Sequence, residues 1–435
     1  MEIYNLISFG GIFAFPLIAW AISENRKILN WRVISYGITL QILVAIFIFV
    51  VPAGSKFFLF LNDIIVQILN SASAGSEFVF GRLALSPGQS NALGEQSIGF
   101  ILAFQGFPTI IFFSALISVL YFLNIMPKII KAFSYVFTKL MKISGAESLV
   151  AASNIFVGIE SAFTVKPHLK DMTRSEFCTV LSVGMATVAS NILALYVFTL
   201  KSQFPTIAAH LISASLLSAP AALVISKIIL PETETPKTLG KHIEPYHEKE
   251  NSLFESIMNG ANSGIKMIVG IVALLIAVLS LTALLDLGLS LIGSKINTLA
   301  NMQFEWSLKN IFGYIFYPFT LIIGVPLSDA GVISKIIGER IIVTEVVAYQ
   351  DLAKAISQGA IQHTRSYVIA TYALCGFAHL ASMSIFVGGV SALAPEKTKI
   401  ISSVAFKALI SATLACLMTA AVAGAFFTKN SILFG

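Results

Sequence analysis

Apolar stretches, each long enough to cross a bilayer as a helix, dominate this chain. A helix needs about 20 consecutive, mainly apolar residues to cross the hydrocarbon core. The pattern therefore predicts an all-α polytopic membrane protein with eight transmembrane helices. We expect these spans at 3–22, 33–52, 98–123, 175–200, 207–230, 262–293, 366–394 and 400–428.

Two other regions, 146–170 and 311–352, are too apolar for surface loops, but Gly and acidic residues interrupt them. Irregular backbone at membrane depth is tolerated only where protein or a water-filled cavity covers it. Both regions are therefore predicted to be re-entrant hairpins, which enter and leave the membrane on one side.

A seven-residue phrase occurs twice, as GMATVAS at 184–190 and as GFAHLAS at 376–382, and a Thr-Arg-Ser triplet precedes each copy. Each copy follows one of the hairpin regions, and the spans between the copies make the two units enter from opposite sides. This arrangement predicts inverted repeats with discontinuous helices, from which many transporters build a midplane binding site. Close helix packing through Gly, Ala and Ser is the alternative explanation of the phrase.

The rest of the chain divides around these two units. Residues 127–144 have the Lys and apolar spacing of an amphipathic helix in the membrane interface. The moderately polar stretch 53–97 predicts an external loop with a short helix near 57–69. We expect a scaffold at 1–145, a first transport repeat at 146–230, a cytoplasmic linker at 231–260, a scaffold span at 261–310, a second transport repeat at 311–394 and a C-terminal span at 395–435.

The charges support a membrane protein and set its expected orientation. Only 11% of the 435 residues are charged, against about 25% in typical soluble domains. The net charge of +6 does not indicate nucleic-acid binding, because Lys and Arg lie at the ends of the spans. Membrane proteins keep such loops cytoplasmic, which places the N- and C-termini outside. The three cysteines lie in apolar spans and indicate neither a disulfide nor a metal site.

Glu160 and Glu345 are the strongest candidates for a functional role, because an ionisable side chain at membrane depth costs about 2.5–3.5 kcal/mol. A structural hydrogen bond that closes a hairpin tip is the alternative for each. Asp329 lies at a predicted tip beside Ser328, where capping of a helix N-terminus explains it equally well. The paired broken repeats argue against an ion channel, and the lack of a nucleophile–base set or a metal motif argues against an enzyme.

The first copy of the phrase has the groups of a cation site. If the helix unwinds there, the carbonyls of Val188 and Ile192 become free, and Thr187 adds a hydroxyl. Asn154, near the first hairpin tip, adds an uncharged acceptor. Oxygen ligands of this kind suit hard cations, and unwound backbone beside half-helix ends binds Na⁺ in transporters.

The second copy differs where it carries His379 in the position of Thr187. A lone His in a membrane helix is either a packing residue or a proton carrier, and its place in the repeat favours a function. Ser382 lies one helical turn further along on the same face. Phe377 supplies an apolar or stacking wall.

Four segments resemble the concentrative nucleoside transporter family, and the resemblance covers about 97–425 with all motifs in order. They are SNIFVGIESAFTVKP (153–167), GVP (324–326), TEVVAYQDL (344–352) and TYALCGFAHLASMSIFVGGVSALAPEK (371–397). The resemblance implies a homotrimer in the plasma membrane, of the bacterial inner-membrane type. It also implies an elevator-like motion that imports nucleosides with sodium or protons, and no resident cofactor.

Carried over residue by residue, the resemblance implies two sites. The ribose would be held by Glu345, His379 and Ser382, with Phe377 nearby, and the base would meet Gly158, Ile159 and Glu160. Sodium would be held by Asn154, Thr187 and the carbonyls of Val188 and Ile192.

Three departures from the family pattern concern the substrate. The family's Gly-Gln-Thr-Glu becomes the shorter Gly-Ile-Glu at 158–160, an Asn becomes His379, and another Asn becomes Thr344. Loss of one hydrogen-bonding group in a site changes substrate preference by orders of magnitude. We therefore expect sodium-driven symport of a nucleoside, a modified nucleoside or another ribosyl compound. Proton coupling through His379 and Glu160 is the alternative.

Overall fold

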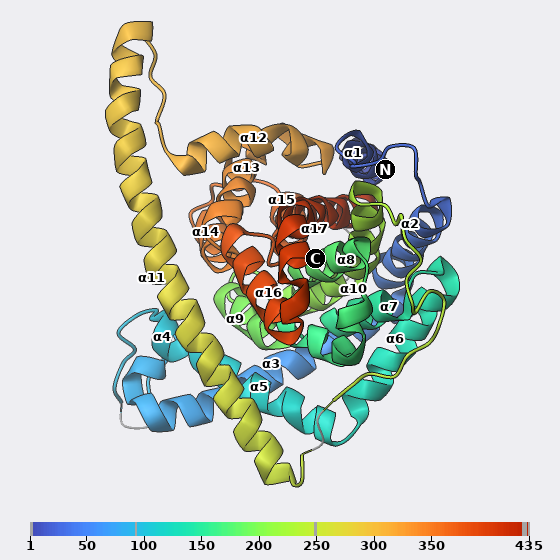
Figure 1. Cartoon of the computed structure of the whole chain (residues 1–435). Coiled ribbons are helices and arrows are strands. Elements are labelled where there is room, and N and C mark those ends of the chain that lie inside the picture. Colours follow the sequence, from blue (N-terminus) through green and yellow to red (C-terminus); the bar gives the residue numbers. More distant parts are fainter. Residues whose placement is uncertain (1–2, 92–93, 248–249, 429–432, 434–435) are drawn as a thin grey trace.

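The chain folds into helices joined by turns, in agreement with the apolar pattern (Figure 1). The computed structural model describes residues 3–91, 94–247, 250–428 and 433, and no β-strand occurs among them. The helices before the middle of the chain are α1 (Ile3–Ala21), α2 (Trp31–Ala45) continued by η1 (Ile46–Val50), α3 (Pro52–Phe80), η2 (Gly81–Ala84), α4 (Leu102–Gln105), α5 (Phe107–Phe122), α6 (Ile125–Met141), α7 (Gly145–Asn154), η3 (Ile159–Asp171), α8 (Arg174–Ala186), α9 (Ser190–Leu200) and α10 (Ile207–Ile229). Those after it are α11 (Leu253–Ala300), α12 (Leu308–Ile322), α13 (Leu327–Ile342), α14 (Glu345–Ser357), α15 (Thr364–Leu374), α16 (Leu380–Leu393), η4 (Pro395–Lys397) and α17 (Thr398–Phe426).

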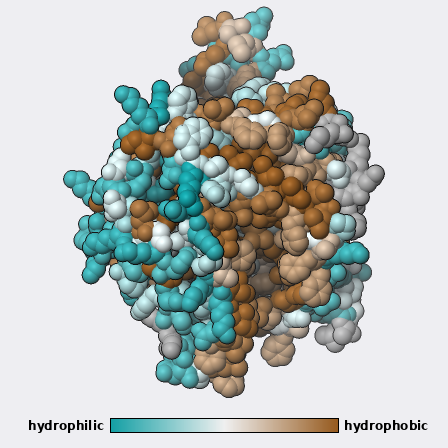
Figure 2. Space-filling model, turned by 90° about the vertical axis from the view of Figure 1, so that its right-hand side faces the viewer, coloured by the Kyte–Doolittle hydropathy of each residue, from teal (hydrophilic) through white to brown (hydrophobic). Residues whose placement is uncertain are grey.

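Eight helices among the described residues are long and apolar enough to cross a membrane, by length and composition. The number agrees with the sequence prediction, but the membership differs. Pro52–Ala84 qualifies where a loop was expected, and the expected span at 366–394 is divided into α15 and α16. Figure 2 shows a broad hydrophobic area on one face, bordered by hydrophilic residues, as expected for contact with lipid.

Helix α1 defines the two sides of the fold. At about 1.5 Å per residue its 19 residues are about 28 Å long, so Tyr4 and Glu24 lie at opposite ends. Arg365 donates through Nη2 to the Tyr4 carbonyl (2.8 Å), whereas Arg174 donates through Nη1 to Glu24 Oε1 (2.6 Å). The Arg174 and Lys407 side chains also hold the pKa of the Glu24 carboxyl below its usual range. The two Thr-Arg-Ser triplets thus lie on opposite sides, here named the Tyr4 side and the Glu24 side, and the inverted repeats are confirmed.

Helix α3 is the largest difference from the sequence prediction, because it is one helix of 29 residues. Arg32, in the first turn of α2, donates through Nε to the Leu140 carbonyl in the last turn of α6 (3.0 Å). Lys131, near the start of α6, pairs with Glu244 of the stretch after α10 (2.5 Å), so α6 lies along the Glu24 side and α5 ends there. Helix α2 begins on the same side, so α2 ends and α5 begins on the Tyr4 side. Helix α3 connects them without a change of side, so α15 and α16 together provide the eighth crossing. Its frequent Asn, Asp and Ser residues lower its mean hydropathy, which is why the sequence pattern favoured a loop.

The first hairpin consists of α7 and η3 and has its base on the Glu24 side. A capping box in which Ser144 and Glu147 exchange hydrogen bonds begins α7. The Gly145 N–H also donates to the Thr238 carbonyl (2.8 Å), and Lys237 pairs with Asp171 at the other end of the hairpin (2.6 Å). The stretch after α10 thus packs along the hairpin base, and α11 begins at Leu253, inside the expected linker range.

The second hairpin consists of α13 and α14 and has its base on the Tyr4 side. Ser8 of α1 donates to the carbonyl of Ile323 just before the hairpin (2.8 Å). Asp329 lies in the first turn of α13, at the base and not at the tip, and is buried. It accepts hydrogen bonds from the Ser366 hydroxyl (2.6 Å) and the His363 N–H (3.0 Å), and so fastens the hairpin to the start of α15.

Both broken helices are interrupted at the repeated phrase. Helix α8 ends at Ala186 and α9 begins at Ser190, while α15 ends at Leu374 and α16 begins at Leu380. The small residues of the phrase also allow the two copies to touch. A Cβ at Gly376 would lie 2.7 Å from the Met185 carbonyl, so the phrase allows the close helix packing that was one explanation of it.

We predict that Gly376→Ala destabilises the protein by about 1–3 kcal/mol, the usual cost of overpacking. A Cβ there would also lie 2.6 Å from Cys416 Sγ. Thermal unfolding of the detergent-purified protein measures the effect. Gly388→Ala is the control, because nothing lies within 4 Å of a Cβ at that position of α16. Equal melting temperatures of the two variants would contradict the prediction.

Candidate functional site

The two hairpin tips meet the two helix breaks in the buried centre of the fold. At the first break, the Ser190 N–H and hydroxyl both donate to the Phe156 carbonyl at the tip of the first hairpin (3.1 and 2.6 Å). The Ser215 hydroxyl of α10 accepts from the Val188 N–H (3.2 Å) and donates to the Val188 carbonyl (3.4 Å). Backbone groups that leave helical pairing thus find partners without water.

An unpartnered oxygen lies next to this first break. Asn154, at the end of α7, is fully buried, and its Nδ2 donates to the Val150 carbonyl (3.2 Å). Its Oδ1 has no hydrogen-bond partner among the described residues. A buried acceptor without a partner is costly unless a donor or a cation satisfies it.

The other residues expected at the cation site lie around the same break. Thr187 caps the C-terminal end of α8 and donates to the Val183 carbonyl (3.0 Å), which leaves the lone pairs of its oxygen available. Val188 lies inside the break. Ile192 is the third residue of the regular helix α9, so its carbonyl points along that helix and not into the break.

Glu345 is the centre of the second group of residues. It is the first residue of α14, directly after the tip of the second hairpin, and is 2% exposed. The Tyr196 hydroxyl of α9 donates to its Oε1 (2.7 Å), and Nε2 of His379 lies 2.7 Å from its Oε2. Residues from both repeats therefore meet at this carboxylate.

The hydrogen bonds of His379 indicate the tautomer of its neutral imidazole. It caps the N-terminus of α16, because its Nδ1 accepts the Ser382 N–H (3.2 Å) while the Ser382 hydroxyl accepts the His379 N–H (3.3 Å). A nitrogen that accepts a hydrogen bond carries no proton, so the proton of neutral His379 lies on Nε2, facing Glu345. The Phe377 ring lies beside this imidazole, with 6.2 Å between the ring centres.

Matching residues of the repeated phrase lie at opposite ends of their breaks. Thr187 follows the C-terminal end of the half-helix α8, where the helix dipole is negative and favours a cation. His379 precedes the N-terminal end of the half-helix α16, where the dipole is positive and favours the carboxylate of Glu345. The two copies therefore carry different chemistry in one symmetric frame.

A cavity of about 410 Å³ reaches the first hairpin tip from the Glu24 side. Gly158 and Glu160 line it, together with residues of α5, α11 and the segment before α11, but Glu345, His379 and Ser382 do not. The side chain of Ile159 lies outside the described part of the structure. The cavity therefore reaches the first hairpin tip, where the base is expected, but not the residues expected to hold the ribose.

Sequence reasoning missed Tyr196 and Ser215, both buried and both bonded to the residues above. A hydroxyl in an apolar span is the signal that marks each of them. Several such hydroxyls serve ordinary helix bonds, for example Thr199, which donates to the Leu195 carbonyl one turn back (2.9 Å). Only the tertiary contacts separate the two groups.

The chain matches three family models. They are described as Na⁺ dependent nucleoside transporter C-terminus (residues 210–424), Na⁺ dependent nucleoside transporter N-terminus (residues 10–83) and Nucleoside recognition (residues 103–203). The N-terminal match begins within the first span and includes the second, so it extends the similarity to residues before 97.

Relatives match this chain over almost its whole length. Nucleoside permease NupC of Helicobacter pylori is 35% identical over 431 residues, which are 98% of this chain and 99% of the permease. Solute carrier family 28 member 3 of Mus musculus is 36% identical over 434 residues, 97% of this chain, but this chain spans only 58% of that relative's length.

Solved structures share the fold. CNTnw in an inward-facing substrate-bound state superposes with a TM-score of 0.86 at 32% identity, covering 98% of both chains. A variant of CNTnw in an outward-facing state gives a TM-score of 0.87 at 31% identity, again over 98% of both chains.

We predict that His379→Ala lowers stability by about 1 kcal/mol or more, because the cap of α16 is lost. His379→Asn keeps a good capping acceptor and is expected to be more stable than the Ala variant. Thermal unfolding of the purified variants at neutral pH makes the comparison. If both variants unfold at the same temperature, His379 does not cap α16.

Proposed function

Because this chain belongs to the concentrative, Na⁺-dependent nucleoside transporter family, we propose that it is a secondary active symporter of nucleosides or related ribosyl compounds. An inward sodium gradient drives the import. The observation that carries the proposal is the buried Glu345 carboxylate, which residues of both inverted repeats contact at the meeting point of a hairpin tip and two broken helices. Neither catalysis nor a resident cofactor is part of it.

The substrate binds between the second break and the first hairpin tip. Glu345, His379 and Ser382 hold the ribose hydroxyls, and the Phe377 ring covers the sugar. A carboxylate and an imidazole are a strong acceptor and a donor for a vicinal diol. The base contacts Gly158, Ile159 and Glu160. The cavity that reaches Gly158 and Glu160 supports this placement of the base.

Sodium binds at the first break. Asn154 Oδ1, the Thr187 hydroxyl and the Val188 carbonyl are the proposed ligands, and Ile192 bounds the site from α9. The unpartnered Oδ1 of Asn154 supports this assignment, as does the negative end of the α8 dipole. All three ligands are oxygens, the type that Na⁺ shares with other hard cations.

The energetics of symport are sufficient for accumulation. Inward movement of one cation gains about 2.3 kcal/mol per 100 mV, and a tenfold sodium gradient adds about 1.4 kcal/mol. The sum of about 3.7 kcal/mol accumulates a neutral solute about 500-fold.

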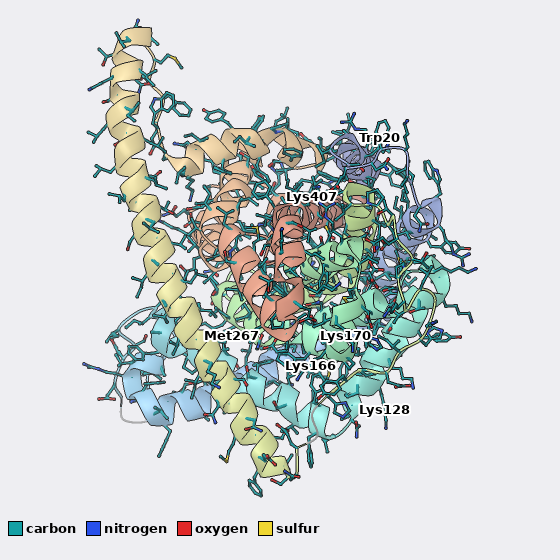
Figure 3. All side chains as sticks on the ribbon, in the orientation of Figure 1. Trp20, Lys128, Lys166, Lys170, Met267 and Lys407 are labelled. Atoms are coloured by element: carbon teal, nitrogen blue, oxygen red, sulfur yellow. The ribbon has the colours of Figure 1, made fainter. Side chains whose placement is uncertain are left out.

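The transport cycle is an elevator-like motion of the repeats against a scaffold that includes α5 and α11, in a homotrimer in the bacterial inner membrane. Lys128, Lys166 and Lys170, which are labelled in Figure 3, come from α6 and η3 at the Glu24 side. We assign this side to the cytoplasm, because Lys and Arg residues are enriched on the cytoplasmic side of membrane proteins, and we place both termini outside. The cavity then opens inward.

Proton coupling through His379 and Glu160 is the alternative to sodium coupling, and the match to Na⁺-dependent family models does not favour it. A second proton on His379 must displace the Ser382 N–H from Nδ1, so protonation would loosen the start of α16. Uptake that follows a proton gradient and ignores sodium would identify this mechanism.

We predict that Glu345→Gln and Ser382→Ala abolish uptake of labelled uridine or adenosine into proteoliposomes with an inward sodium gradient. The carboxylate and the hydroxyl are the polar groups proposed to hold the ribose. The exposed Glu95→Gln is the matched control and should transport normally. Normal accumulation by both site variants would refute the proposed site. Uptake by the unaltered protein that is independent of any ion gradient would refute symport.

We predict that Thr187→Ala raises the sodium concentration needed for half-maximal uptake about tenfold, equivalent to loss of about 1.4 kcal/mol from the ion site. Thr199→Ala is the control, because Thr199 makes the same hydrogen bond one turn back in the other half of this broken helix. An equal sodium dependence of the two variants would remove Thr187 from the site.

A further inference from the structure

Arg340 is a fully buried arginine that the proposed transport site does not use. It lies in the last turn of α13, just before the tip of the second hairpin. Its Nη1 donates to the Ala373 carbonyl (2.6 Å), while its Nε and Nη2 have no hydrogen-bond partner among the described residues. Burial of a charge is expensive unless the charge is compensated.

No carboxylate of the described residues forms an ion pair with Arg340. The neighbouring Glu339 pairs with Lys309 (2.5 Å). The groups that interact electrostatically with the guanidinium are the thiols of Cys375 and Cys416 and the hydroxyl of Tyr349. Its compensation therefore comes from carbonyl dipoles and weakly polar groups.

The charge of Arg340 acts at the C-terminal end of α15, through the Ala373 carbonyl. Ala373 is the second-last residue of α15, so its carbonyl is one of those left without a partner at a helix C-terminus. The Tyr349 hydroxyl donates to the Thr371 carbonyl in the same turn (2.9 Å). The negative end of the α15 dipole thus meets a fixed positive charge.

The first repeat has no such charge at the corresponding place. Helix α7 contains neither Lys nor Arg. It ends at Asn154, which precedes Glu160 by six residues, whereas Arg340 precedes Glu345 by five. Where the second repeat offers a guanidinium to the end of α15, the first offers the unpartnered Oδ1 of Asn154, just before the Phe156 carbonyl that binds Ser190 at the first break.

We propose that Arg340 is a built-in cation of the second repeat, in the place where the first repeat takes a mobile sodium ion. The inference rests on the proposed function, since it presupposes the ion at Asn154. The C-terminal ends of α8 and α15 both favour a positive charge. The end of α15 receives it from Arg340, and the end of α8 receives it from a sodium ion taken from solution. The two breaks therefore bind one coupling ion per cycle, and the second break is held together without sodium.

The test compares Arg340→Gln with Arg340→Lys in proteoliposomes. The Lys variant keeps the charge and should keep a single-site dependence of uridine uptake on sodium chloride. The Gln variant replaces the charge by an amide oxygen, as in Asn154, and should create a second sodium requirement. We expect its Hill coefficient for sodium to rise from about 1 toward 2. An unchanged Hill coefficient in Arg340→Gln would overturn the inference.

Two further measurements keep the inference testable. If Arg340→Gln does not fold, the zero-flux potential of the unaltered protein gives the stoichiometry: one sodium per nucleoside supports the inference, and two overturn it. If uptake by the unaltered protein ignores sodium, the proposed coupling fails, but not yet the role of Arg340. In that case sodium chloride, compared with choline chloride, should raise the melting temperature of Arg340→Gln and not that of Arg340→Lys, and equal responses would overturn the inference.

Discussion

This structure depends on one constraint: backbone N–H and carbonyl groups that lose their helical hydrogen bonds in the dry interior must find other partners. Two helices are interrupted in the buried centre, after Ala186 and after Leu374, and each interruption frees N–H and carbonyl groups at a depth where water is scarce. A hairpin tip from the same repeat meets each break, and Ser190, Ser215, Tyr349 and Arg340 supply the missing hydrogen bonds. In the proposed function, the polar groups that remain without a protein partner, such as Asn154 Oδ1, bind the ion.

The two repeats share this frame but use opposite ends of it. In the first repeat, the C-terminal end of α8 carries Thr187, and Asn154 has an unpartnered oxygen. Both features favour a cation. In the second, the N-terminal end of α16 faces Glu345 through His379, and Arg340 already occupies the opposite, C-terminal end of α15. Under the proposed function, one repeat holds the ion and the other the ribose hydroxyl groups, although their sequences align residue for residue over the repeated phrase.

Charged residues at the ends of helices and hairpins hold these breaks in place. Arg174 and Arg365, the central residues of the two triplets, bind the two ends of α1, while Asp329 fastens the second hairpin to α15. At the base of the first hairpin, buried Lys227 lies 2.5 Å from Glu147. Buried pairs of this type do little for net stability, but loss of one partner is costly, so they favour a single arrangement of the hairpins.

The sequence by itself determined the membrane class, the two interrupted repeats and their inversion, since apolar run length and the duplicated phrase are local signals. It also marked Glu160, Glu345 and His379, because polar groups in apolar runs are conspicuous. Tertiary structure alone decided that α3 does not change sides, that Asp329 lies at a hairpin base, and that the Ile192 carbonyl stays within α9. It alone brought Tyr196 to Glu345 and Arg340 to the end of α15. These contacts join residues 149 and 33 positions apart, and no local pattern records which distant group satisfies a freed carbonyl or carboxylate.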